Sequence, residues 1–108
     1  MPRRSYKTDI KINGLKIIEV IIDPHFAVKH SDSITDSIIL ELVKTLDGGL
    51  FEPIEVKNGF QYFVSEPVIH KGKAYRLVWL LEKNHSIYIG VINAFRRQWW
   101  KRKTELSN

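Results

Sequence analysis

The stretch KAYRLVWLLEKNHSIYIGVINAFRRQWWKRK, from Lys73 to Lys103, decides the fold. It contains two runs rich in β-branched and aromatic residues, Ala74–Glu82 and Ser86–Phe95, separated by the polar segment Lys83-Asn84-His85. Two such runs joined by a short polar turn predict an antiparallel hairpin. We place this hairpin at the centre of a β-sheet.

Two further β-prone runs precede this hairpin, Phe51–Val56 and Phe60–Ser65. Asn58-Gly59 joins them, and Lys71-Gly72 leads into the central hairpin. Both connectors have the length of hairpin turns. The second half of the chain therefore predicts a meander of up to four strands.

The first half of the chain begins with another β-prone run, residues 15–22. Asn13-Gly14 precedes it and allows Asp9–Ile12 to pair with it as a hairpin. Asp23 and Pro24 then predict the start of a short helix, over about Pro24–His30, because aspartate suits the N-cap and proline the first turn.

A second helix is predicted from Ser33 as its cap to Asp47-Gly48-Gly49, where glycine favours termination. Its apolar residues recur with helical period and predict a face that packs on the sheet. They are Ile34, Ile38, Ile39, Leu42, Val43 and Leu46.

This order of elements predicts an α+β fold in a single domain, residues 1–108. We expect an N-terminal strand and two short helices packed on one face of a four- to five-stranded antiparallel sheet. Residues 1–8 are expected to form a flexible basic arm, residues 9–97 the core, and residues 98–108 a basic aromatic tail.

Composition narrows the class of protein. The 108 residues carry a formal net charge of +5, which favours polyanionic partners, nucleic acid first. Cysteine is absent, which excludes disulfides and thiolate metal sites and fits a cytoplasmic location. Apolar runs are too short to span a membrane, and the N-terminus lacks the apolar segment of a signal peptide.

A cluster of titratable residues falls in the first predicted helix. His25 and Lys29 are four residues apart and share a helix face, and His30 follows. Histidine titrates near neutral pH and is the usual general acid or base. His25 and His30 lie about 140° apart around the helix, and therefore are poorly placed to share a metal ion. The alternative is that both are partly exposed surface residues.

Arg76 and Arg96 are the second candidate group. A guanidinium inside an apolar strand is costly unless it is paired. Arg76 either pairs with a glutamate, with Glu19, Glu55, Glu66 and Glu82 as candidates, or binds a phosphate, which arginine grips with two hydrogen bonds. If Arg76 and Arg96 share a face of the sheet, they form an anion clamp, with Gly90 leaving room for a ligand.

The tail after the last strand interleaves cations with aromatic rings. This pattern suits stacking on unpaired bases together with phosphate neutralisation. The alternative is that the tryptophans dock on the core while the charges stay in water. The residues are Arg97, Trp99, Trp100, Lys101, Arg102 and Lys103.

The order strand, two helices, meander, with YRLVWLL and IGVINAFRR on the last two strands, resembles the RelE/HigB toxin ribonucleases. His25-Phe26-Ala27-Val28-Lys29-His30 is also similar to the H-x-x-x-K-H element of colicin-type and contact-inhibition ribonucleases of the same barnase/EndoU/colicin/RelE superfamily. The resemblance spans roughly residues 15–97.

The resemblance implies a small, metal-independent endoribonuclease that needs no cofactor and is paired with an acidic antitoxin protein. It further implies that RNA is cleaved by attack of the 2′-hydroxyl on the adjacent phosphate. His25 or His30 would then act as acid or base, Lys29 as an electrostatic helper, and Arg76 and Arg96 as the phosphate clamp. Two alternatives stay open, a non-catalytic nucleic-acid-binding protein and an antitoxin- or immunity-type interaction protein.

Overall fold

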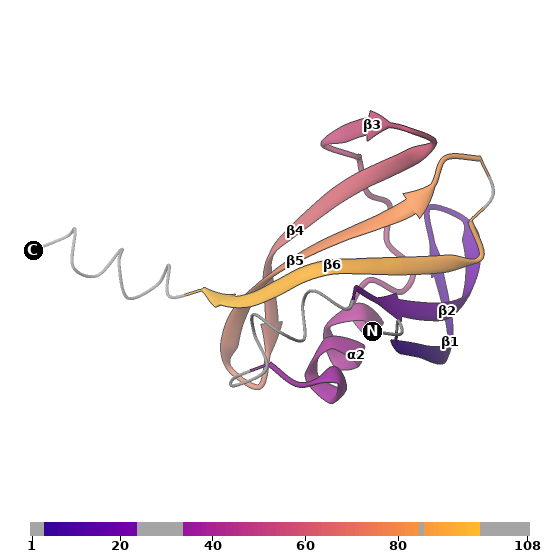
Figure 1. Ribbon diagram of the computed structural model, residues 1–108. Helices are drawn as coiled ribbons and strands as arrows, with labels where there is room; N and C mark the ends of the chain where they lie inside the picture. The colour runs from indigo at the N-terminus through magenta and orange to yellow at the C-terminus, as the bar shows by residue number, and fades with distance from the viewer. Residues whose placement is uncertain (1–3, 24–33, 85, 98–108) are drawn as a thin grey trace, which may run out of the picture.

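The computed structural model describes residues 4–23, 34–84 and 86–97. In this part of the chain six strands form one sheet in the order β1-β2-β6-β5-β4-β3, and one helix, α2, lies on one side of it (Figure 1). The elements are β1 (Arg4–Ile12), β2 (Leu15–Ile22), α2 (Asp36–Lys44), β3 (Glu55–Lys57), β4 (Phe60–His70), β5 (Lys73–Glu82) and β6 (Tyr88–Arg97).

The predicted fold class is wrong in the number and the direction of the strands of the sheet. The sheet has six strands instead of four to five, and it is mixed instead of antiparallel, because β2 and β6 run parallel. A parallel pair requires a long crossover connection, and the connection between β2 and β6 contains α2 and strands β3, β4 and β5. The prediction of two helices is replaced by one helix in the described residues. The first predicted helix, Pro24–His30, lies outside them.

The prediction of a flexible basic arm over residues 1–8 is wrong from Arg4 onward, because these residues form strand β1. Two nitrogens of the Arg4 guanidinium, Nε and Nη2, donate hydrogen bonds to the Asp36 carboxylate, at 2.6 and 2.8 Å, and the Tyr6 hydroxyl donates to the same group. These bonds lower the pKa of Asp36, with the Arg4 hydrogen bonds as the largest cause. The arm is therefore pinned to the start of α2.

Three of the predicted hairpin turns are present. Asn13-Gly14, Asn58-Gly59 and Lys71-Gly72 each have two successive residues with positive φ, between 51° and 81°. This is the conformation of a type I′ turn, whose twist matches that of the strands it joins.

The strand bounds around these turns differ from the prediction. Of the run Phe51–Val56 only Glu55 and Val56 belong to a strand, β3, which ends at Lys57, and Pro53, which has no N–H group to donate, lies just before it. In contrast, β4 continues to His70, because a bulge between Ser65 and Val68 accommodates Pro67.

Helix α2 starts later than predicted, because Thr35, not Ser33, is its N-cap. The Thr35 side chain accepts a hydrogen bond of 3.2 Å from the Ile38 backbone N–H. The helix also ends earlier than predicted, at Lys44, so that Ile34 and Leu46 lie outside it. All the apolar residues predicted for this helix are nevertheless buried except Ile38, which is partly buried against the core.

The core lies between α2 and the face of the sheet that carries Trp79. The Trp79 ring stacks on Phe63 with a centroid separation of 4.1 Å, and its indole N–H donates a 3.0 Å hydrogen bond to Ser65. Tyr75, Leu77 and Leu81 are buried on the same face, as strand alternation requires.

Candidate nucleic-acid interface

The face of the sheet opposite α2, called the outer face below, carries large half-buried side chains. Strand register aligns them across neighbouring strands on this face. A sheet face open to water is normally polar, and a contiguous apolar surface marks a site of interaction. The residues are Ile21, Phe60, Tyr62, Val64, Val78, Leu80, Tyr88 and Phe95.

A bulge in β6 decides which arginines belong to the outer face. Val78 pairs with Asn93, but the next residue, Trp79, pairs with Val91, so that Ile92 is an extra residue on β6. An extra residue reverses the alternation of side chains beyond it. Arg97 therefore lies on the outer face with Gly90, and Arg96 does not.

The register of β5 and β6 places the three arginines accordingly. Arg76 pairs with Phe95 on the outer face, whereas Arg96 pairs with the buried Tyr75 on the face that carries the core. The clamp considered between Arg76 and Arg96 is thus not formed. Arg97, two residues beyond Phe95, takes its place beside Arg76.

Arg76 and Arg97 converge on one carboxylate, that of Glu66 at the bulge of β4. Arg97 Nε lies 2.5 Å from Glu66 Oε2, and Arg76 Nε lies 4.0 Å from Oε1. Of the four glutamates considered as partners of Arg76, the structure selects Glu66. Two guanidinium groups against one carboxylate leave a net charge of +1 at this cluster.

The geometry of this cluster leaves hydrogen-bonding capacity unused. The Nε atoms of Arg76 and Arg97 are buried and have no hydrogen-bond partner in the described part of the protein. The short Arg97–Glu66 separation is a contact between charges, because its N–H does not point at the oxygen. The two side chains as a whole nevertheless remain 37% and 29% exposed to solvent.

Phe95 supports the Arg76 side chain, whose guanidinium carbon lies 5.7 Å from the centre of the Phe95 ring. A cation over an aromatic face is stabilised by the ring quadrupole. The arrangement presents a flat aromatic ring and a guanidinium side by side on the outer face.

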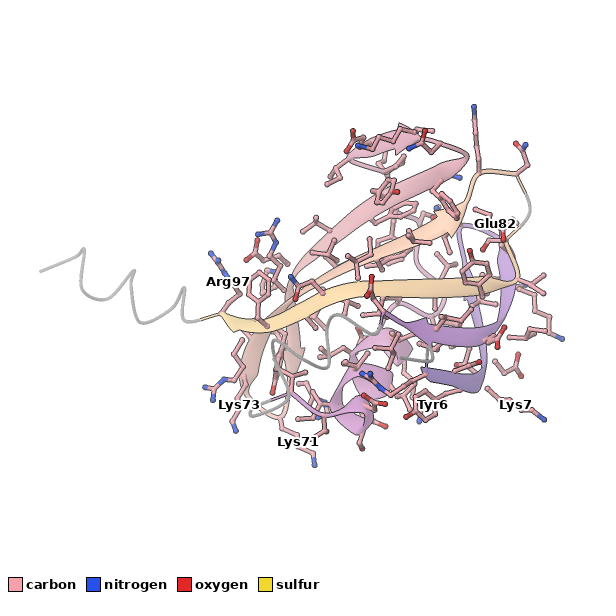
Figure 2. All side chains as sticks on the ribbon, viewed as in Figure 1. Tyr6, Lys7, Lys71, Lys73, Glu82 and Arg97 are labelled. Atoms are coloured by element: carbon pink, nitrogen blue, oxygen red, sulfur yellow. The ribbon has the colours of Figure 1, made fainter. Side chains whose placement is uncertain are left out.

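Further basic residues lie near Arg97, at the end of the sheet where β5 starts and β6 ends. Figure 2 shows Lys71, in the β4–β5 turn, and Lys73, the first residue of β5, at the same end of the molecule as Arg97, and Glu82 at the opposite end. His70 belongs to this end too, with its ring centre 6.3 Å from that of Tyr75. Positive charge is thus concentrated where β5 starts and β6 ends.

The remaining predicted site residues lie outside the described residues. They are His25, Lys29 and His30 of the first predicted helix and Trp99, Trp100, Lys101, Arg102 and Lys103 of the tail. Their roles stay predictions.

A hollow of about 180 Å³ lies farther along the outer face, toward Glu82. Leu80 and Gly90 pair at its base, and Tyr88, Phe60, Ile21 and Asp23 are among the residues that line it. A side chain on Gly90 would enter the space of Leu80, since its Cβ would lie 2.9 Å from Leu80 Cδ1. Glycine at this position therefore leaves room for the Leu80 side chain.

Comparison of the chain with protein-family models, curated proteins and solved structures gives no match. Residues 4–23, 34–84 and 86–97 contain no group of three or more His, Cys, Asp or Glu side chains placed to hold a metal ion. Nor does this part of the chain include a helix long and apolar enough to cross a membrane.

Proposed function

We propose that this protein is a small, toxin-type endoribonuclease of the RelE/HigB kind that acts on RNA in the cytoplasm without a metal ion. The observation that carries the proposal is the pair Arg76 and Arg97 on the outer face, which share Glu66 and keep a net positive charge. Arginine binds the two oxygens of a phosphate in a planar, bidentate manner.

The arginine pair suits the charge that develops during RNA cleavage. The 2′-oxygen forms a bond to phosphorus as it loses its proton, and the bond from phosphorus to the 5′-oxygen breaks as that oxygen gains a proton. Negative charge grows on the phosphoryl oxygens in between. Positive groups fixed beforehand at this position stabilise the transition state, which is usually the largest contribution to catalysis.

Proton transfer is assigned to His25 or His30, with Lys29 as an electrostatic helper. This assignment rests on the resemblance of His25–His30 to the H-x-x-x-K-H element of colicin-type and contact-inhibition ribonucleases, and on the ability of histidine to titrate near neutral pH. We predict that His25→Ala abolishes cleavage and leaves RNA binding nearly unchanged, because Arg76 and Arg97 hold the phosphate without it.

The test is incubation of the purified protein with messenger, ribosomal and transfer RNA in EDTA. The proposal predicts fragments that end in 2′,3′-cyclic phosphate and 5′-hydroxyl groups, and far fewer fragments with Arg97→Ala. Intact RNA with the folded wild-type protein would contradict it. Growth arrest on expression, relieved by an acidic antitoxin protein, is the expected behaviour in cells.

A second candidate function is RNA binding without cleavage. It is favoured by the composition of the outer face, where arginines and half-buried aromatic rings suffice for binding without any histidine. Salt-dependent binding with no turnover, unchanged by His25→Ala and weakened by Trp99→Ala, would select it.

A further inference from the structure

We infer that the hollow beside Gly90 is a subsite for one unpaired nucleobase of the RNA, with preference for a base that carries an amino group. This inference rests on the proposed binding of RNA by Arg76 and Arg97 and adds a second point of contact on the same face. The occupant is a single base of a single-stranded segment.

Size and lining support a flat ring as the occupant. The hollow measures about 180 Å³, below the roughly 300–1,000 Å³ of pockets for drug-sized ligands. Leu80, Ile21 and the rings of Tyr88 and Phe60 offer apolar and aromatic surface to a base. Aromatic side chains bind unpaired bases by stacking, whatever the sequence.

Asp23 is the charged residue among those that line this hollow. The Asp23 backbone N–H donates a 3.0 Å hydrogen bond to the Val91 carbonyl, which ties this end of β2 to β6 at the hollow. An ionised carboxylate accepts hydrogen bonds at about four lone-pair positions, and can therefore accept from a base in addition to its contacts within the protein. The amino group of cytosine is a suitable donor.

The position of the hollow relative to the arginines suits one strand of RNA. Leu80 and Arg76 are four residues apart on β5 and point to the same face, which places them about 13 Å apart. Asn93 and Val78 lie between them on the outer face. A single-stranded segment lying along β5 and β6 would place a phosphate at Arg76 and Arg97 and a base in the hollow.

The experiment measures the affinity of the full chain for labelled oligocytidine and oligouridine of equal length. Wild type is expected to bind oligocytidine more tightly, and Asp23→Asn to reduce that preference toward one. Tyr88→Leu should weaken binding of both by about tenfold through loss of stacking, whereas Tyr88→Phe should restore it. Tyr62→Leu is the comparison, because Tyr62 lies on the same face and does not line the hollow, and it should cost less affinity than Tyr88→Leu.

Equal affinity of Tyr88→Leu and Tyr62→Leu would overturn the inference and leave the proposed function standing. If Tyr88→Leu fails to fold, Ile21→Phe, which fills the hollow from β2, must give the same tenfold loss. Unchanged binding by Arg97→Ala would instead count against the proposed function, so the two failures are distinguishable.

Discussion

Arg97 on β6 reaches across β5 to Glu66 on β4, and their charged atoms lie 2.5 Å apart. The residue beside Arg97 on β5 is Ala74, which pairs with it and is buried. Neighbouring strands lie about 4.8 Å apart, and only a small side chain at position 74 lets arginine span two of these spacings. The contact between Arg97 and Glu66 thus depends on the length of the arginine side chain, on the bulge of β4 at Glu66, and on the small side chain of Ala74 on β5.

Arg97→Ala should weaken binding of single-stranded RNA by about tenfold, because one charge-assisted contact to a phosphate is lost. The slope of log K against log salt should fall by about 0.7. The matched control is Arg96→Ala, which removes the same charge one residue away on the opposite face and should change the affinity by less than about threefold. Equal losses for the two variants in a fluorescence titration would contradict the assignment of Arg97 to the site.

Glu66→Gln should strengthen RNA binding by about threefold to tenfold, because the net charge of the arginine cluster rises from +1 to +2 and a carboxylate no longer repels the phosphate. The variant should also depend more steeply on salt. Glu55→Gln on β3, an exposed residue at another part of the sheet, makes the same change in total charge. If both substitutions raise the affinity equally, net charge alone explains the gain and Glu66 has no local role.

The stability of the protein should depend on Asp36 at acidic pH. Hydrogen bonds from Arg4 and Tyr6 lower the pKa of Asp36 in the folded state below its value of about 3.9 in the unfolded state. The contribution is therefore complete above about pH 5 and is lost as pH falls through the folded-state pKa.

Asp36→Asn should cost about 1–2 kcal/mol of unfolding free energy at pH 7 and progressively less below pH 4. Thermal unfolding of both proteins from pH 3 to pH 7 measures the difference. A difference that stays constant over this range would mean that the carboxylate charge does not anchor β1 to α2.

Trp79 should be among the most sensitive positions of the core. It is fully buried, stacks on Phe63, meets Phe51 edge-on at 5.4 Å and donates to Ser65. Trp79→Ala should cost about 3–5 kcal/mol in urea unfolding, and Trp79→Phe clearly less, since Phe retains the ring stacking. Near-equal costs would place the energy in the indole hydrogen bond instead of the packing.

The sequence predicted local structure well where residues close together in the chain determine it. Asn13-Gly14 and Asn58-Gly59 form the expected turns because few residue types adopt two successive positive φ angles at low cost. The buried face of α2 follows from helical period. The parallel pairing of β2 with β6 joins residues about 70 positions apart, and no local pattern encodes it.

The sequence predicted that Arg76 and an arginine at the end of the last strand share a face of the sheet, but it named Arg96 where the structure has Arg97. Arg76 and the arginines after Phe95 signal an anion site, because cations are unfavourable in apolar strands. Simple alternation, however, places Arg96 with Gly90, and the extra residue at Ile92 brings Arg97 there instead. Glu66 was one of four candidate partners, and only the register of β4 with β5 distinguishes it.

The most direct test of the account is a map of where single-stranded RNA touches the protein. Backbone amide chemical shifts of the isotope-labelled chain, followed during titration with a short oligonucleotide, provide it. The account predicts the largest changes at Glu66, Arg76, Gly90, Phe95 and Arg97 on the outer face. Changes confined to α2 and the strand residues beneath it, with these five amides unmoved, would contradict it.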